Sequence, residues 1–83
     1  MITIYGGAGC PWCQRAKELA EGTGLKFEYK DVKADPEARN EFDELFPNTR
    51  TIPQIMWNGN HFDSYKAFAE EVQNTRNYGE GAI

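Results

Sequence analysis

"MITIYGGAGCPWCQRAKELAE", residues 1–21, changes from one backbone pattern to another near its centre. The β-branched run "MITIY" followed by "GGAG" predicts a buried strand that ends in a tight loop. Pro11 suits the first position of a helix, because its φ is already fixed and its missing N–H is not needed there. Residues 11 to about 21 are good helix formers, and the "GTG" after them predicts the helix end. We expect the inward side of this helix to carry Cys13, Ala16, Leu19 and Ala20.

A second strand and a second helix follow. Residues 25–32, "LKFEYKDV", alternate apolar and charged side chains from Leu25 onward, which predicts a strand. Asp35 followed by Pro36 is typical of a helix N-terminus, and the apolar spacing predicts a helix to about Phe46. We expect its buried face to consist of Ala38, Phe42, Leu45 and Phe46.

A hairpin comes next. Residues 54–57, "QIMW", and residues 60–62, "NHF", predict two short strands. Between them stand Asn58 and Gly59, the strongest short signal for a hairpin turn.

The last periodic segment predicts a third helix. Asp63 or Ser64 can cap its start, and the pattern runs to about Asn74, with Tyr65, Phe68 and Val72 facing inward. Residues 76–83 have no periodic pattern, so we expect a loose tail after a domain of residues 1–75.

The predicted element order is β-α-β-α-β-β-α. The first β-α-β unit requires a right-handed parallel crossover, and the hairpin adds antiparallel strands. The sequence therefore predicts an α/β fold, with a mixed four-stranded sheet covered by three helices.

Composition limits the classes of function. The chain has 83 residues, of which 40% are hydrophobic, so it can form one small domain with a core. A formal net charge of -4 argues against a nucleic-acid partner, which requires clustered Lys and Arg. The sequence contains neither a run of roughly 18 apolar residues nor a basic-then-apolar leader. Two cysteines do not make a secreted disulfide framework, so we expect a cytoplasmic protein.

The two cysteines occupy unequal positions. Cys10 lies at the N-terminal edge of the first helix, where unpaired N–H groups and the helix dipole favour an anion. We therefore expect a lowered thiol pKa for Cys10, because a thiolate is such an anion. Cys13 lies one turn further inside and should be less exposed. This arrangement predicts that Cys10 attacks a disulfide and Cys13 resolves the product by thiol–disulfide exchange.

Two other interpretations of the pair compete with a redox couple. A purely structural disulfide would close so short a loop that it would constrain the unfolded chain little. A structural zinc site needs four ligands, whereas the sequence offers Cys10, Cys13 and His61 and contains no second CxxC. A metal could still bind through a cluster shared by two subunits. His61 alone is more often a surface or satisfied histidine than a base. A CPxC between a strand and a helix favours the redox couple.

"TIYGGAGCPWCQRAKELAE" followed by "TIPQIMWNGNHF" resembles the glutaredoxins, of the small dithiol type within the thioredoxin-like fold. The likeness covers residues 1 to about 73, and the family includes very small members that bacteriophages encode. The resemblance implies a glutathione-dependent thiol–disulfide oxidoreductase with Cys10 as nucleophile and Cys13 as resolving thiol. It implies glutathione as reductant without a tightly bound cofactor, and a monomer that reduces protein disulfides and glutathione mixed disulfides. Ribonucleotide reductase is a candidate electron acceptor by family analogy alone.

The resemblance also implies a glutathione subsite around "TIP". Pro53 matches the family's cis-proline, which would turn the backbone of Ile52 toward Cys10, with Thr51 beside it. Ile52 could then pair with the extended cysteinyl part of glutathione as a short added strand does. Without the CxxC, Pro53 would simply start an edge strand. Trp12 stands where the family usually has tyrosine, and either side chain forms an aromatic wall beside the sulfur.

Two departures from the family pattern concern the carboxylates of glutathione. The loop "GGAG" has no Lys or Arg where many relatives carry one, and Arg50 is the nearest substitute, unless it is an ordinary surface arginine. After "HF" the family usually has Gly-Gly, two residues and Asp, whereas this chain has "DSYKAF". The altered residues are Asp63, Ser64 and Ala67.

The start of the last helix should still bind an anion. The amides of Tyr65 and Lys66 can reach the γ-glutamyl carboxylate, with Asp63 opposing and Lys66 attracting it. Alternatively, Asp63 or Ser64 only caps the helix.

Two other functions remain open. The chain could be a redoxin of similar fold that takes electrons from thioredoxin reductase, which the altered "DSYKAF" favours. It could also be an iron–sulfur carrier dimer that uses Cys10 and glutathione. Pro11 argues against the carrier, because relatives that hold clusters usually lack that proline.

Overall fold

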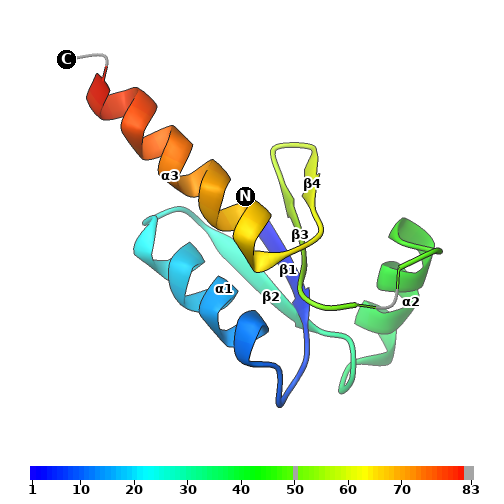
Figure 1. The fold of residues 1–83 in the computed structure, drawn as a ribbon. Coiled ribbons are helices and arrows are strands. Elements are labelled where there is room, and N and C mark those ends of the chain that lie inside the picture. Colours follow the sequence, from blue (N-terminus) through cyan, green and yellow to red (C-terminus); the bar gives the residue numbers. More distant parts are fainter. Residues whose placement is uncertain (50, 82–83) are drawn as a thin grey trace.

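A computed structural model describes residues 1–49 and 51–81, and the side chains up to residue 74 apart from residue 50. Its elements follow the predicted order β-α-β-α-β-β-α (Figure 1). Their bounds are β1 Ile2–Gly6, α1 Pro11–Gly22, β2 Phe27–Asp31, α2 Pro36–Leu45, β3 Gln54–Trp57, β4 Asn60–Phe62 and α3 Tyr65–Gly81.

The four strands form one mixed sheet in the order β2-β1-β3-β4. β1 pairs with β2 in parallel, while β1–β3 and β3–β4 are antiparallel pairs. Helices α1 and α3 lie together on one face of the sheet, and α2 lies on the other (Figure 1). This confirms the predicted thioredoxin-like architecture. The C-terminal end of β1 lies beside the N-terminal end of β3, because these two strands are antiparallel.

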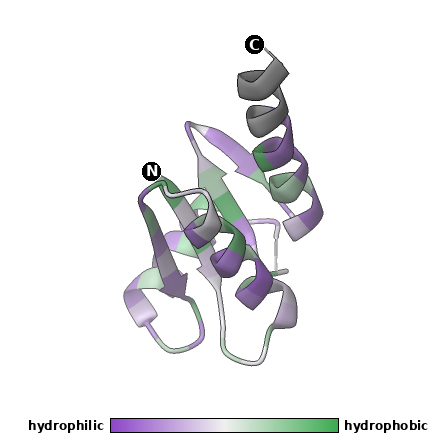
Figure 2. Cartoon of the chain, turned by 90° about the vertical axis from the view of Figure 1, so that its left-hand side faces the viewer, coloured by the Kyte–Doolittle hydropathy of each residue, from purple (hydrophilic) through white to green (hydrophobic). Residues whose placement is uncertain are grey.

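The face under α1 and α3 holds the larger apolar core. Figure 2 shows hydrophobic stretches in the middle of the sheet, whereas much of the outer strands and of the helices is hydrophilic. Phe68 of α3 is fully buried and packs edge-to-face on Trp57, with 6.0 Å between ring centroids. The buried members of this core are Ile2, Ile4, Ala16, Ala20, Ile55, Trp57, Phe68 and Val72.

The face under α2 holds a smaller core crossed by polar contacts. Tyr5, Val32, Ala38, Phe42 and Phe46 are its buried residues. At its border Lys30 Nζ lies 2.7 Å from Glu41 Oε1, and the Tyr5 hydroxyl donates to the same carboxylate. The hydrogen bond from Lys30 and that from Tyr5 lower the pKa of Glu41, and the bond to Glu41 raises the pKa of Lys30. Burial, then the bond to Glu41, raises the pKa of Tyr5.

Local signals in the sequence explain the element boundaries. Asp35 caps α2 by accepting the Glu37 N–H at 3.0 Å, with Pro36 in the first turn. Asn58 and Gly59 both have positive φ, 52° and 79°, as a two-residue hairpin turn requires. The predicted α2 N-cap and hairpin are confirmed.

The second strand begins later than predicted, and one apolar residue predicted to be buried is exposed. Leu25 is 48% exposed, because the chain still turns there: its N–H donates to Thr23 Oγ1 at 3.1 Å, and β2 begins only at Phe27. Leu45 is 50% exposed, because α2 ends at that residue. Phe46, the next residue, has non-helical backbone (φ -130°, ψ 64°) and lies in the core, which confirms its predicted burial.

The predicted end of the last helix at about Asn74 is wrong. α3 continues to Gly81, through most of the segment predicted to be a loose tail. Residues 75–81 contain no proline, and a glycine inside a helix costs only about 1 kcal/mol. Residues 82 and 83 lie outside the described residues, and the division into a domain and a tail stays a prediction. Among the described residues, none of the helices is both long and apolar enough to cross a bilayer.

Candidate active site

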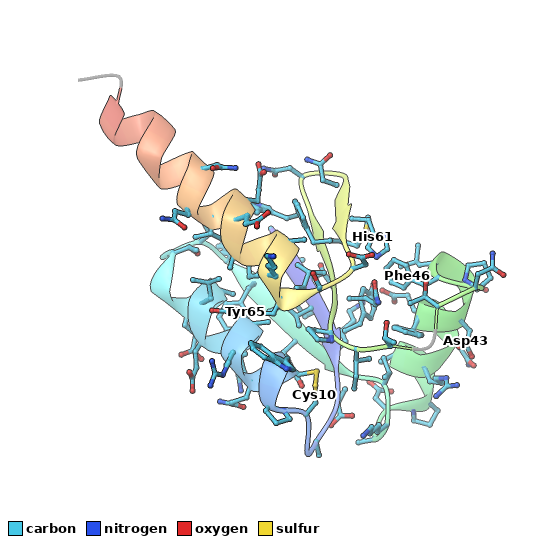
Figure 3. All side chains as sticks on the ribbon, in the orientation of Figure 1. Cys10, Asp43, Phe46, His61 and Tyr65 are labelled. Atoms are coloured by element: carbon cyan, nitrogen blue, oxygen red, sulfur yellow. A yellow bond between two sulfur atoms is a disulfide. The ribbon has the colours of Figure 1, made fainter. Side chains whose placement is uncertain are left out.

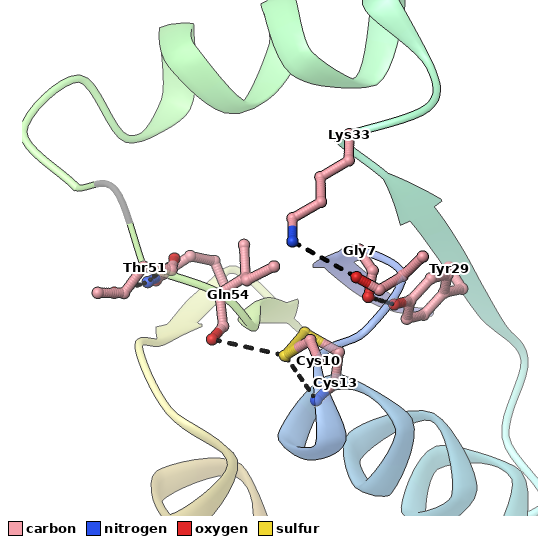
Figure 4. Close-up of a disulfide and its surroundings, with 9 residues drawn as sticks. Gly7, Cys10, Cys13, Tyr29, Lys33, Thr51 and Gln54 are labelled. Atoms are coloured by element: carbon pink, nitrogen blue, oxygen red, sulfur yellow. Dashed lines mark hydrogen bonds between the residues drawn. A yellow bond between two sulfur atoms is a disulfide. The ribbon is translucent and has the colours of Figure 1, made fainter.

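The two cysteines lie at the junction of β1 and α1, where the sequence predicts them. Cys10 is the N-cap of α1, with extended backbone (φ -104°, ψ 104°), and Pro11 is the first helical residue. The Sγ atom of Cys10 accepts the N–H of Cys13 at 3.2 Å, so a helix amide points at this sulfur (Figure 4). The two residues form a disulfide, with 5.2 Å between their Cα atoms. The helix N-terminus thus provides the anion-stabilising surroundings expected for Cys10.

The surroundings of the two sulfurs differ. Cys13 is fully buried against β1, whereas Cys10 is half-buried. A Cβ atom on Gly6 would lie 3.0 Å from the Cβ of Cys13 and 2.5 Å from the Tyr29 hydroxyl, so glycine is needed for this close packing. An incoming disulfide can therefore approach Cys10 more readily than Cys13.

The segment of residues 51–53 lies opposite Cys10. The Ile52–Pro53 peptide bond is cis, which confirms the geometry that the resemblance implies. The Ile52 carbonyl oxygen lies 3.9 Å from Cys10 Sγ (Figure 4). Pro53 is buried, Ile52 half-buried and Thr51 exposed. Arg50, the predicted partner of a glutathione carboxylate, lies outside the described residues.

An aromatic wall borders the disulfide on the side of α3. Trp12 is 54% exposed, which fits its predicted place at the open start of α1. Its ring lies 5.5 Å from that of Tyr65 at an interplanar angle of 30°, and the Arg15 guanidinium lies 4.9 Å from the Trp12 centroid. This wall offers a flat, partly apolar surface beside Cys10.

A cavity of about 350 Å³ lies between this wall, the cis-proline segment and the start of α3. Ser64 Oγ accepts the Ala67 N–H at 3.1 Å, so Ser64 is the residue that caps α3. Asp63 borders the same cavity. The structure thus brings most of the predicted glutathione subsite together, since the cavity is lined by Trp12, Ile52, Pro53, Asp63, Ser64, Tyr65 and Lys66.

Lys33 is a residue near the site that sequence reasoning missed. Its Nζ lies 3.4 Å from the Ala8 carbonyl oxygen, so it reaches the loop before Cys10 (Figure 4). A Cβ on Gly7 would lie 2.8 Å from Lys33 Cδ, so the glycine makes room for the lysine stem. Asp31 Oδ1 accepts the Lys33 N–H at 2.9 Å and fixes this turn. The sequence could have indicated this contact. Lys33 comes shortly after β2, and the carboxyl ends of the parallel strands β1 and β2 lie side by side, so the residues that follow them are neighbours.

The family model for glutaredoxin matches residues 2–62 of this chain. The chain belongs to the glutaredoxin family. It is 32% identical over 76 residues to glutaredoxin 1 of Escherichia coli strain K12, an alignment that covers 84% of this chain and 89% of the relative. Over 58 residues it is 40% identical to a Pseudomonas aeruginosa glutaredoxin, which covers 70% of this chain and 67% of the relative.

Solved structures give the same result. The solution structure of reduced Escherichia coli glutaredoxin superposes with a TM-score of 0.73 at 30% identity, and it covers 88% of this chain and 93% of that chain. A buckwheat glutaredoxin–glutathione complex superposes with a TM-score of 0.74, covering 89% and 69%, but at 17% identity it shows the fold alone. Glutaredoxins are thiol–disulfide oxidoreductases. The family therefore favours a redox couple over a purely structural cross-link for Cys10 and Cys13.

Proposed function

We propose that this chain uses glutathione as its reductant and reduces glutathione mixed disulfides and protein disulfides. The observation that carries the proposal is the cavity of about 350 Å³ beside Cys10, which joins an aromatic wall, a cis-proline segment and a helix N-terminus. Each of these offers a different contact to an extended tripeptide. The buckwheat relative was solved with glutathione, which supports the proposal at the level of the fold.

The contacts follow from the chemistry of the ligand. The Ile52 backbone can pair with the cysteinyl residue as an added strand does, which presents its sulfur to Cys10. The first amides of a helix have no partner within the helix, so those of Tyr65 and Lys66 suit the γ-glutamyl carboxylate. Lys33, held at the loop before Cys10, supplies a positive charge for the glycyl carboxylate.

The reaction is two successive exchanges. The Cys10 thiolate attacks one sulfur of the substrate disulfide, and the other sulfur leaves as a thiolate that takes up a proton. The Cys13 thiolate can then attack Cys10 Sγ and release the second thiol. Alternatively, a glutathione thiolate attacks the substrate-derived sulfur, forms a disulfide with it and releases the Cys10 thiolate. With Cys13 the product is the Cys10–Cys13 disulfide of this structure. Two glutathione molecules reduce that disulfide and become one glutathione disulfide.

The test is a coupled turnover assay run with two sources of electrons. One series contains glutathione and glutathione reductase, and the other contains thioredoxin reductase, each with the same glutathione mixed disulfide as substrate. We expect turnover in the first series only. Turnover only with thioredoxin reductase would contradict the proposal and favour the rival function. The position of Asp63 favours that rival function, because its negative charge lies beside the cavity and would oppose a glutathione carboxylate there.

Three further expectations belong to the same proposal. These are a cytoplasmic location, a monomeric state and ribonucleotide reductase as one electron acceptor. A glutathione reductant supports the first, because glutathione keeps cytosolic thiols reduced.

A further inference from the structure

Gln54 is the one polar or charged residue among the described side chains that is buried, and it is 0% exposed. It begins β3 directly after the cis-proline and pairs with Tyr5 of β1. Side chains alternate along a strand, so Gln54 and Met56 face α2, while Ile55 faces the core under α1 and α3. A buried amide is unfavourable unless it is hydrogen-bonded, so its partners matter.

Both ends of the Gln54 amide have partners. The Nε2 atom donates to the Thr51 carbonyl oxygen at 2.9 Å and contacts Thr51 Oγ1 at 3.2 Å. The Oε1 atom lies 2.5 Å from Nε2 of His61 on β4. Because the Gln54 amino group is used by Thr51, its oxygen must accept and His61 Nε2 must donate.

His61 connects this pair to the second helix. Its ring stacks on Phe46, with 4.5 Å between centroids and an interplanar angle of 30°. Phe46 is the C-cap of α2 and is buried in the core on that face. Figure 3 shows the two labelled side chains facing each other between β4 and α2. The contacts therefore run from the end of α2 through His61 and Gln54 to Thr51.

These contacts end at Thr51, one residue before Ile52, whose backbone faces the Cys10 sulfur. Thr51 is exposed and precedes Ile52, whose carbonyl lies 3.9 Å from Cys10 Sγ. The buried Gln54 side chain donates to the Thr51 carbonyl oxygen, three residues earlier in the chain (Figure 4). We propose that Gln54 and His61 are positioning residues for thiol–disulfide exchange. They fix the backbone of residues 51–52, so that the peptide backbone next to the substrate's reacting sulfur can pair with Ile52.

The proposal needs only the disulfide exchange itself and does not require glutathione as reductant. Its test uses full-length protein that is reduced beforehand and mixed, in single turnovers, with two oxidants. One is a disulfide-linked cysteinyl peptide, which has a backbone to pair with Ile52. The other is 2-hydroxyethyl disulfide, which has none. The ratio of the two rate constants reports positioning, whereas a general loss of folded protein lowers both rates alike.

Three variants separate the contacts. Gln54→Met keeps the length of the side chain and removes both contacts. Gln54→Glu keeps an acceptor for His61 but has no donor for Thr51. His61→Phe keeps a ring on Phe46 and removes the donor to Gln54. Asn60→Ala, at the exposed neighbour of His61 on the same strand, is the control.

We expect both Gln54 variants to lower the peptide rate about five- to tenfold, as the loss of a buried hydrogen bond does, with the small-disulfide rate within about twofold. His61→Phe should lower the peptide rate about two- to fivefold, and Asn60→Ala should leave the peptide rate unchanged. Because the residues act as a unit, adding His61→Phe to Gln54→Met should lower the rate no further. An unchanged rate ratio in folded Gln54→Met would overturn the proposal. If that variant does not fold, an unchanged ratio in His61→Phe would overturn it equally.

Discussion

The two faces of the sheet are built differently. Under α1 and α3 the core is apolar, and it buries Cys13 while Trp12 and Tyr65 lie at its border. Under α2 the core is smaller and is accompanied by hydrogen bonds, from Lys30 to Glu41 at its border and from Gln54 to Thr51. The first face carries the two cysteine sulfurs, and Gln54 on the second face contacts Thr51 in the segment opposite Cys10. If Gln54 positions this segment as proposed, the site depends on both faces, although its two sulfurs lie on one.

The largest expected effect comes from replacing the two cysteines, and it should differ between Cys10 and Cys13. Cys10→Ser should abolish reduction of every disulfide substrate, because the half-buried sulfur at the helix N-terminus is the proposed nucleophile. Cys13→Ser should remove reduction of protein disulfides that need a second thiol but keep deglutathionylation, because free glutathione can resolve the mixed disulfide. Turnover is measured on a glutathionylated peptide and on a protein disulfide. Equal losses in both variants on the glutathionylated peptide would contradict the assignment of roles.

The sequence predicts the elements of both faces because their signals are local. Asp35 with Pro36 predicts the start of α2, and Asn58 with Gly59 predicts the hairpin, since each needs only neighbouring residues. Periodicity alone misplaces Leu45, because it cannot show that the backbone leaves the helical conformation at the next residue.

The site is predicted less completely. The positions of Cys10 and Cys13 follow from one strand–helix junction. The contact of Lys33 with the loop before Cys10 joins residues 25 positions apart, and it exists only because β1 and β2 are parallel and adjacent. The bond between Gln54 and His61 depends on the register of the hairpin and on the face toward which both residues point. Such contacts can be recognised only when the pairing and register of the strands are known.

The second prediction concerns the ion pair on the α2 face. Hydrogen bonds from Lys30 and Tyr5 lower the pKa of Glu41, so its ionised form stabilises the folded state. This contribution is complete above the ordinary glutamate pKa of about 4.3 and is lost as pH falls through the lowered folded value. Glu41→Gln should therefore lower the free energy of unfolding at pH 7 by about 1 kcal/mol or less, since the carboxylate is 42% exposed.

Urea unfolding at several pH values measures that difference. The gap between wild type and Glu41→Gln should be constant from about pH 6 to 8 and shrink below about pH 4. Asp43→Asn is the matched control, because Asp43 pairs with Arg39 on the same helix with both side chains more than half exposed. We expect almost no effect from the control. A gap for Glu41→Gln that grows as pH falls would contradict the argument.

The smallest expected effects lie at the border of the first face, where charges are exposed. Asp63 and Lys66 are both exposed and line the cavity at the start of α3. If the γ-glutamyl carboxylate binds there, Asp63→Gly should lower the Michaelis constant for glutathione and Lys66→Ala should raise it, each about two- to fivefold. Unlike the Glu41 pair, these exposed charges are fully open to screening, so both effects should shrink in 1 M salt.

The signs of the two changes decide what Asp63 does. Because Ser64 already caps α3, replacing Asp63 leaves the hydrogen bond to Ala67 in place, and the helix start should keep its geometry. A raised Michaelis constant in Asp63→Gly would therefore mean that the carboxylate binds the glutamyl ammonium group instead of repelling the carboxylate beside it. No effect from either change would place the glutathione carboxylate elsewhere and favour thioredoxin reductase as the electron source. Steady-state kinetics at two salt concentrations distinguishes these outcomes.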